Sequence, residues 1–151
     1  MTGARPDTCF VYVIAADLAV GPVKVGIAAD PVTRCRDLQT GHYRRLQLTS
    51  TYAVPNREIA LYIERAFHET QKKHRLRGEW FDMDPDKAFI ILTFALGGAL
   101  SAHADMDSDE INEIIRLSRR QYAGVHIMES AFVGPHQNHY AGDAAVCMAC
   151  P

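Results

Sequence analysis

The residues best suited to chemistry begin in one short stretch, from Phe10 to Arg34. Tyr12, Lys24 and Arg34 supply a phenol, an ammonium group and a guanidinium group where plain core residues would serve a strand or helix equally well. Glu64 adds a carboxylate further along the chain. Hydrolysis of a phosphodiester needs a deprotonated water, a stabilised phosphorane and a neutralised leaving oxyanion. This set of side chains contains a group for each of these needs.

The elements that must position these groups start with a hairpin. Segments 10–14 and 23–27 are rich in β-branched and aromatic residues, which predicts two strands, and Gly21-Pro22 marks the turn between them. If Tyr12 pairs with Lys24, then Phe10 falls opposite Gly26. Because side chains alternate along a strand, Tyr12, Lys24 and Gly26 would share one face, and the valines would form the other.

A short helix is predicted to follow the hairpin and to carry Arg34. Asp30 is typical of an N-cap, and Pro31 suits the first helical position. Gly41 is a stop signal, so the predicted helix covers residues 32–40.

A third strand and a second helix come next. Apolar residues alternate with polar ones over 46–54, which predicts a strand. Pro55-Asn56 is predicted to begin a helix whose apolar arc faces the sheet. This helix is predicted to end in a run of basic residues, where Gly78 stops it. Glu64 lies at the border of this arc, and His68 follows one turn later.

Two further helices are predicted. The third runs from Pro85 to about Leu96 and is closed by Gly97-Gly98. The fourth begins at Asp107, which forms a capping box with Glu110. The fold class expected is α+β: a small antiparallel three-stranded sheet flanked by helices, with a C-terminal helical extension. The predicted divisions are a flexible N-terminus (1–8), the main domain (9–96), the helical extension (97–124) and a tail (125–151).

The order of the chemical residues resembles that of the GIY-YIG nuclease superfamily. Phe10-Val11-Tyr12 stands in the place of the first motif and Lys24-Val25-Gly26 in the place of the second, followed by Arg34 and Glu64. Two neighbouring segments, "DPVTRCRDLQTG" and "GEWF", are similar to sequences of a phage and bacterial branch of this superfamily, often labelled as an Orf172-type DNA-binding domain. The resemblance covers about residues 9 to 94 and implies the same small α+β fold.

Three positions depart from that pattern. Phe10 replaces the first glycine, and Lys24 replaces the second tyrosine, as it does in restriction enzymes of the superfamily. Many members also carry an asparagine near the end of the domain, but none occurs between Gly78 and Phe94. The missing asparagine and Phe10 favour an alternative in which the fold binds DNA without cleaving it.

The resemblance implies a role for each residue. Tyr12 would be the general base or would position the water, helped by the nearby charge of Lys24, which favours a phenolate. Arg34 would clamp the scissile phosphate, and Glu64 would bind one Mg²⁺ or Mn²⁺ ion. His68 would shuttle a proton or hold the metal's water, unless it is simply an exposed helix histidine.

Charge is distributed unevenly along the chain, although the net charge is only -2. Residues 31–78 hold ten Lys/Arg against four Asp/Glu, and residues 83–151 hold four against nine. The basic part predicts a DNA partner, with a solvated helix face as the alternative. The acidic C-terminal region offers a further hypothesis, an adaptor that binds a protein partner. The residues expected on the phosphate backbone are Arg44, Arg45, Lys72, Lys73, Arg75 and Arg77.

Composition and cysteine usage predict a cytoplasmic protein. The first residues are polar, with no signal-peptide pattern, and four cysteines suit a reducing compartment. Residues 88–99 are apolar but shorter than a bilayer span, so they predict a core helix and no membrane partner. Glu79 is expected to form a structural ion pair.

The tail contains two pairs of metal-binding residue types: His136, His139, Cys147 and Cys150. Four such ligands match a tetrahedral Zn²⁺ site in type, although the pairs are closer together than in common zinc fingers. The alternative is an extension that carries these residues by chance. The sequence as a whole therefore predicts a metal-dependent DNA endonuclease, with a non-catalytic DNA-binding module of the same fold as the alternative.

Overall fold

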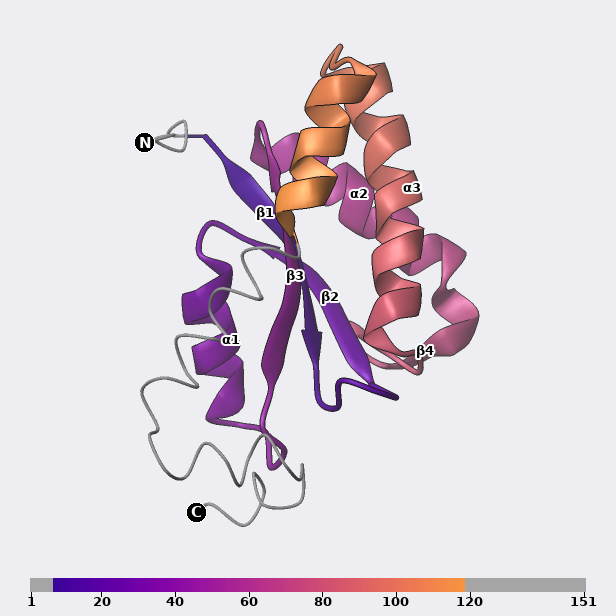
Figure 1. The fold of residues 1–151 in the computed structure, drawn as a ribbon. Coiled ribbons are helices and arrows are strands. Elements are labelled where there is room, and N and C mark those ends of the chain that lie inside the picture. Colours follow the sequence, from indigo (N-terminus) through magenta and orange to yellow (C-terminus); the bar gives the residue numbers. More distant parts are fainter. Residues whose placement is uncertain (1–6, 119–151) are drawn as a thin grey trace.

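A five-stranded antiparallel sheet lies at the centre of the computed structural model, which describes residues 7–118 (Figure 1). The strands are ordered β3-β1-β2-β5-β4 across the sheet. They are β1 (Cys9–Ala15), β2 (Val23–Ala28), β3 (Gln47–Val54), β4 (Arg75–Arg77) and β5 (Trp80–Phe81). The α+β class and the first three strands agree with the sequence prediction, but the predicted sheet of three strands is too small.

The two additional strands form a small hairpin in a segment for which the sequence predicts the end of a helix. α2 (Arg57–Thr70) stops before this segment, and a 3₁₀ turn (η1, Lys72–His74) leads into β4. Gly78 joins β4 to β5 with a φ of +57°, a left-handed conformation that favours glycine. Because β4 and β5 are three and two residues long, neither displays the alternation by which strands are found in a sequence.

Tyr12 pairs with Gly26 across β1 and β2, and Lys24 pairs with Ile14. The predicted pairing of Tyr12 with Lys24 is therefore wrong by two residues. Because side chains alternate with a period of two, a shift of two leaves every side chain on its predicted face. Tyr12, Lys24 and Gly26 share one face, as expected.

The backbone of Gly26 lies directly against the Tyr12 side chain. A Cβ atom at position 26 would lie 2.5 Å from the Tyr12 hydroxyl oxygen and 2.8 Å from its Cζ atom. Tyr12 is only 1% exposed, so its ring has no free space into which to move. Position 26 therefore requires a residue without a side chain, although glycine generally weakens a strand.

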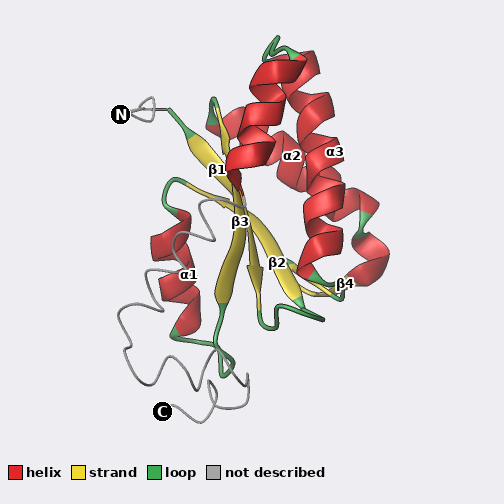
Figure 2. Cartoon of the chain, viewed as in Figure 1, coloured by secondary structure: helices red, strands yellow, loops and turns green. Residues whose placement is uncertain are grey.

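Helices cover both faces of the sheet (Figure 2). α1 (Pro31–Gln39) packs on the face that carries Tyr12, which belongs there to a small buried cluster. α2, α3 (Pro85–His103) and a helix that begins at Ser108 cover the other face. The valines of β1 and β2 form the main core with α2 and α3.

α3 continues through Gly97 and Gly98, where the sequence predicts that a helix ends. Glycine in a helix interior costs about 1 kcal/mol relative to alanine. Beyond the glycines, Ala99 and Leu100 are 2% and 0% exposed, and their burial in the main core offsets that cost. The predicted end near Leu96 is therefore wrong, and the domain boundary predicted after residue 96 falls inside a continuous helix.

Among residues 7–118, α3 alone is long and apolar enough to cross a membrane by length and composition. This criterion is weak evidence, because the core helix of a soluble protein also meets it. Ala88, Leu92 and Leu96 of α3 are fully buried against the main core. Their burial agrees with the predicted core helix.

The predicted capping box at the start of the last helix is confirmed. Asp107 Oδ1 accepts a hydrogen bond from Glu110 N at 2.9 Å, and Glu110 Oε2 accepts one from Asp107 N at 3.0 Å. Ile111 follows and is buried in the main core. The helix is described as far as residue 118.

We expect Gly26→Ala to lower the free energy of unfolding by about 1–3 kcal/mol, the usual cost of overpacking. Gly97→Ala is the matched control, because a Cβ there meets nothing within 4 Å. Replacing that helix glycine should raise stability by up to about 1 kcal/mol. Urea unfolding followed by circular dichroism measures both changes. A Gly26→Ala variant as stable as the wild type would contradict the tight packing of Tyr12 on Gly26.

Candidate functional site

Tyr12 and Arg34 meet although they come from different elements. Tyr12 lies buried in the middle of β1, and Arg34 lies exposed at the end of the first turn of α1. The Asp30 side chain fixes the start of α1 by accepting a hydrogen bond from Thr33 N at 3.1 Å. The Arg34 guanidinium lies close enough to the Tyr12 phenol for the two groups to perturb each other's pKa. A buried phenol is thereby placed near an exposed cation.

The ionisation of Tyr12 is governed by burial. Burial raises the pKa of the Tyr12 phenol above its ordinary value, and the nearby Arg34 guanidinium opposes this only in part. Tyr12 is therefore a neutral phenol at neutral pH. A neutral phenol can both donate and accept a hydrogen bond.

Lys24 forms an ion pair with Glu79, which lies in the turn between β4 and β5. The Lys24 side chain is 8% exposed and the Glu79 side chain 42%. The predicted structural ion pair of Glu79 is confirmed. The cation that acts on the pKa of the Tyr12 phenol is Arg34, whereas Lys24 lies opposite Ile14, two residues along β2 from the partner of Tyr12.

Glu64 approaches this cluster from α2, on the other side of the sheet. Burial raises the pKa of the Glu64 carboxyl, as does the negative charge of Glu79, while the charges of His68 and Lys24 lower it. The charge of Glu64 in turn acts on the Tyr12 phenol. The phenol and the two carboxylates therefore lie within electrostatic reach of one another.

His68 completes the edge of β2. β5 is two residues long and pairs only with the first part of β2, and beyond it His68 Nε2 donates a hydrogen bond to Val25 O at 2.9 Å. A carbonyl oxygen only accepts, so Nε2 carries a proton in this contact. The imidazole also lies 5.0 Å from the Phe81 ring, measured between centroids. These contacts hold α2 against the sheet one turn after Glu64.

Glu64 is the residue of this cluster best suited to bind a divalent cation. Among residues 7–118 nothing donates a hydrogen bond to its carboxylate, whereas Glu79 is paired with Lys24. Mg²⁺ is commonly held by one or two carboxylates, with waters and substrate phosphates as the other ligands. One oxygen ligand of the type that Mg²⁺ and Mn²⁺ prefer is therefore present, and the other ligands of such an ion would be waters and phosphates.

A zinc site of several protein ligands is not present in the described part of the chain, where no three His, Cys, Asp or Glu side chains are grouped to hold a metal. The zinc site predicted in the tail falls outside residues 7–118, so it stays a prediction. Its residues are His136, His139, Cys147 and Cys150.

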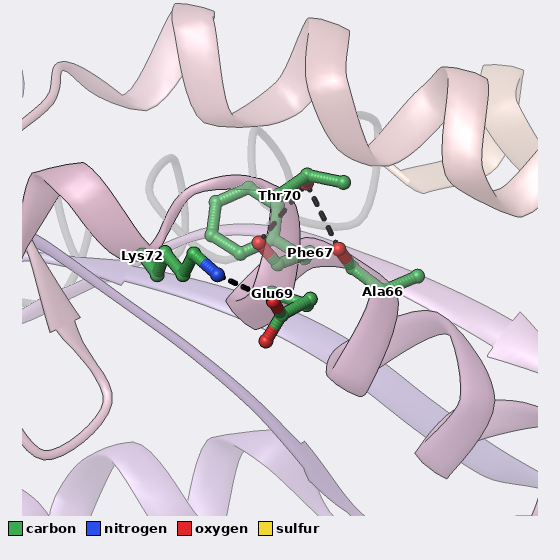
Figure 3. Close-up of polar contacts among 5 residues, drawn as sticks. All are labelled: Ala66, Phe67, Glu69, Thr70 and Lys72. Carbon is green, nitrogen blue, oxygen red and sulfur yellow. Dashed lines mark hydrogen bonds and ion pairs between the residues drawn. The ribbon is translucent and has the colours of Figure 1, made fainter.

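The basic residues predicted to contact phosphates are all exposed. They are Arg44 and Arg45 in the loop after α1, and Lys72, Lys73, Arg75 and Arg77 after α2. Lys72 Nζ forms an ion pair with Glu69 Oε1 at 2.8 Å, beside the Thr70 hydroxyl that donates to the carbonyl groups of the preceding turn (Figure 3). An exposed pair of this kind contributes little to stability, so a phosphate can replace Glu69 as the partner of Lys72.

A contact between two aromatic rings joins the basic loop after α1 to the basic segment after α2. The His42 ring in the loop after α1 lies 5.2 Å from the Trp80 ring of β5, measured between centroids. Arg44 follows His42 in that loop, and Arg77 pairs with Trp80 across β4 and β5. The sequence prediction missed His42 and Trp80, because nothing local relates a loop to a strand so far along the chain.

We expect Glu64→Gln to be more stable than the wild type at neutral pH in metal-free buffer. Because the folded-state pKa of Glu64 is raised, its contribution to stability is lost as the pH rises from the ordinary carboxyl pKa through the raised one. Glutamine does not ionise, so the difference should vanish in acid. Thermal unfolding over a pH series in EDTA measures it.

The control for this prediction is Glu58→Gln, which removes an exposed carboxylate from the same helix. That variant should not gain stability at neutral pH. Added Mg²⁺ should stabilise the wild type, by about 2.7 kcal/mol at one hundred times the Kd, and should not stabilise Glu64→Gln. A Glu64→Gln variant less stable than the wild type at neutral pH would contradict the conclusion that burial and the charge of Glu79 disfavour an ionised Glu64.

Comparison with known protein families gives a match. The sequence profile of the T5orf172 domain matches residues 9–94, which include the whole site just described. This domain is found in phage and bacterial nuclease-like proteins. No curated protein and no solved structure matches the chain significantly. Since the profile covers more than half of the 151 residues, the chain belongs to the T5orf172 domain family.

Proposed function

We propose that residues 9–94 form a divalent-metal-dependent DNA endonuclease of the GIY-YIG type. The observation that carries this proposal is the convergence of three groups: the buried Tyr12 phenol of β1, the exposed Arg34 guanidinium of α1 and the Glu64 carboxylate of α2 lie near enough for both charges to act on the phenol. A phenol, a phosphate-binding cation and a metal-binding carboxylate are the groups that phosphodiester hydrolysis needs. The membership of the T5orf172 domain family supports a nuclease-related or DNA-binding role.

Arg34 binds the scissile phosphate in this mechanism. Its guanidinium has five N–H donors in a planar fork. Because Arg34 is exposed, these donors can bind a phosphate oxygen. The phosphate is thereby held next to the Tyr12 hydroxyl, and charge that develops on it is stabilised.

Tyr12 orients the attacking water. As a neutral phenol it donates its O–H to the water or the phosphate. The water oxygen forms a bond to phosphorus, the bond from phosphorus to the leaving oxygen breaks, the water proton passes to solvent, and the leaving oxygen takes a proton from solvent. The Tyr12 phenolate would also accept the water proton, but the raised pKa of Tyr12 makes that form scarce at neutral pH.

Glu64 would hold one Mg²⁺ or Mn²⁺ ion, which supplies positive charge to the developing oxyanion when bound. Glu79 acts at a distance, since its charge raises the pKa of Glu64 while its own carboxylate is held by Lys24. Breaking that ion pair would leave Lys24 buried and unpaired. Lys24, Glu79 and His68 are therefore positioning residues in this proposal.

The alternative is a DNA-binding module of the same fold that does not cleave. The ion pair between Lys24 and Glu79 favours it, because the pair neutralises a cation that the resemblance assigns to catalysis. In both cases DNA is the partner. The two functions differ in whether Mg²⁺ or Mn²⁺ permits plasmid nicking.

We expect Glu64→Gln to reduce plasmid nicking by two decades or more while DNA affinity stays nearly unchanged. Loss of a catalytic electrostatic group costs roughly 3–4 kcal/mol of transition-state stabilisation. Tyr12→Phe keeps the ring and removes only the hydroxyl, so it should also impair cleavage without unfolding the protein. Arg34→Ala should impair cleavage and weaken binding. An Mg²⁺ titration of plasmid nicking measures these effects.

Glu58→Gln is the matched control and should nick plasmid at the wild-type rate, because Glu58 is an exposed carboxylate in the first turn of α2. Nicking that survived Glu64→Gln unchanged would defeat the assignment of Glu64. If the wild type nicks no plasmid with either metal but binds DNA, the non-catalytic alternative holds.

We expect affinity for DNA to fall steeply with salt. Counterion release makes log K fall roughly linearly with log salt, with a slope of about -0.9 per phosphate contact on duplex DNA. Reversing the charge of Lys72 and Lys73 should weaken binding to all sequences alike and reduce that slope. Lys87→Glu, an exposed change in the first turn of α3, is the control. Affinity independent of salt would rule out the basic surface, which is formed by the exposed residues Arg44, Arg45, Lys72, Lys73, Arg75 and Arg77, as the binding site.

A further inference from the structure

Three aromatic rings form a stack beside the candidate site. The His42 and Tyr43 rings are 5.3 Å apart with an interplanar angle of 8°, and the His42 and Trp80 rings are 5.2 Å apart at 26°. Trp80 pairs with Lys24 across β5 and β2, which places the stack next to the site. Tyr43 is 89% exposed, so the outer ring of the stack presents a wide aromatic surface to solvent.

The loop that carries this stack is held in shape by Gln39, at the end of α1. Gln39 Nε2 donates hydrogen bonds to His42 O at 3.1 Å and to Arg44 O at 2.8 Å, and its Oε1 accepts one from Leu46 N at 2.7 Å. His42 Nδ1 accepts a further bond from Arg44 N at 3.1 Å. A surface ordered in this way loses little entropy when a ligand binds.

The cations around the stack define what it would bind. The Arg44 Cζ atom lies 5.6 Å from the centroid of the Tyr43 ring, and Arg77 pairs with Trp80. An exposed aromatic ring among phosphate-binding cations is the arrangement by which proteins bind single-stranded nucleic acid, with a base on the ring and phosphates on the cations. Bases within a duplex are covered on both faces, so only an unpaired base can stack on Tyr43.

We propose that the Tyr43–His42–Trp80 stack is a platform for an unpaired nucleobase, and that the preferred substrate is DNA with a single-stranded segment next to the cleaved phosphate. The second part rests on the proposed function. The platform itself requires only that the domain binds DNA. The rings differ in role from the basic residues around them, because the rings recognise a base and the basic residues recognise phosphates.

The test compares the affinities of three probes in EDTA, where cleavage cannot occur: an oligothymidylate, an abasic strand of the same length, and a duplex. The wild type should bind the oligothymidylate about tenfold more tightly than the abasic strand, equivalent to about 1.4 kcal/mol. Both strands carry the same phosphates, so the difference reports the base alone.

The variants separate base from phosphate recognition. Tyr43→Ala should abolish the preference for the oligothymidylate, and Tyr43→Phe should retain it because the ring remains. Arg44→Ala should weaken binding of both strands equally. Tyr62→Ala is the matched control, since Tyr62 is also an exposed tyrosine (52%) but lies on α2. Trp80 is the only tryptophan, so unchanged emission checks that a variant keeps the loop folded.

Equal affinity of the wild type for the oligothymidylate and the abasic strand would overturn the platform, and so would a preference that survives Tyr43→Ala. Nicking is measured separately, with Mg²⁺, on a duplex and on a duplex with a single-stranded flap. Equal nicking of both without any oligothymidylate preference overturns the platform and leaves the proposed nuclease standing. An oligothymidylate preference without nicking supports the platform and overturns the nuclease.

Discussion

The contact between the Tyr12 phenol and the Arg34 guanidinium is the interaction on which the candidate site depends. It requires an empty Cβ position at Gly26, because a Cβ atom there would lie only 2.5 Å from the Tyr12 hydroxyl oxygen. It also requires the N-cap at Asp30, whose hydrogen bond fixes the start of the helix that carries Arg34. The glycine and the cap therefore act together, and a change in either moves the phenol or the cation.

The short length of β5 gives α2 its part in the site. A longer strand would pair with the rest of β2 and cover Val25 O, but here His68 binds that carbonyl in place of a strand. The helix is thereby held close to the edge of β2, and Glu64 comes within electrostatic reach of Tyr12 and Glu79. The pKa of Glu64 is raised because the ionised carboxylate is disfavoured at this position, and a bound cation would favour the ionised form.

Binding and chemistry are assigned to different surfaces of the same fold in our proposals. The exposed basic residues supply affinity that does not depend on sequence. The buried phenol and its neighbours supply the chemistry, because partial exclusion of water strengthens each of their interactions. The aromatic stack lies between them, since Trp80 pairs with both Lys24 and Arg77. A strand held by its phosphates would thus present a base to Tyr43 near the proposed scissile bond.

Local sequence determined much of this protein: the three longer strands, the helices with their caps, the face shared by Tyr12, Lys24 and Gly26, and the order of the chemical residues. These features follow from side-chain periodicity and capping, which act over a few residues. Tertiary structure alone decided the register of the first hairpin, the small β4–β5 hairpin and the length of α3. The first hairpin closes with a hydrogen bond from Ala16 N to Pro22 O. It also paired Lys24 with Glu79 and stacked His42 on Trp80, because the energies of such contacts arise between residues that only the folded chain brings together.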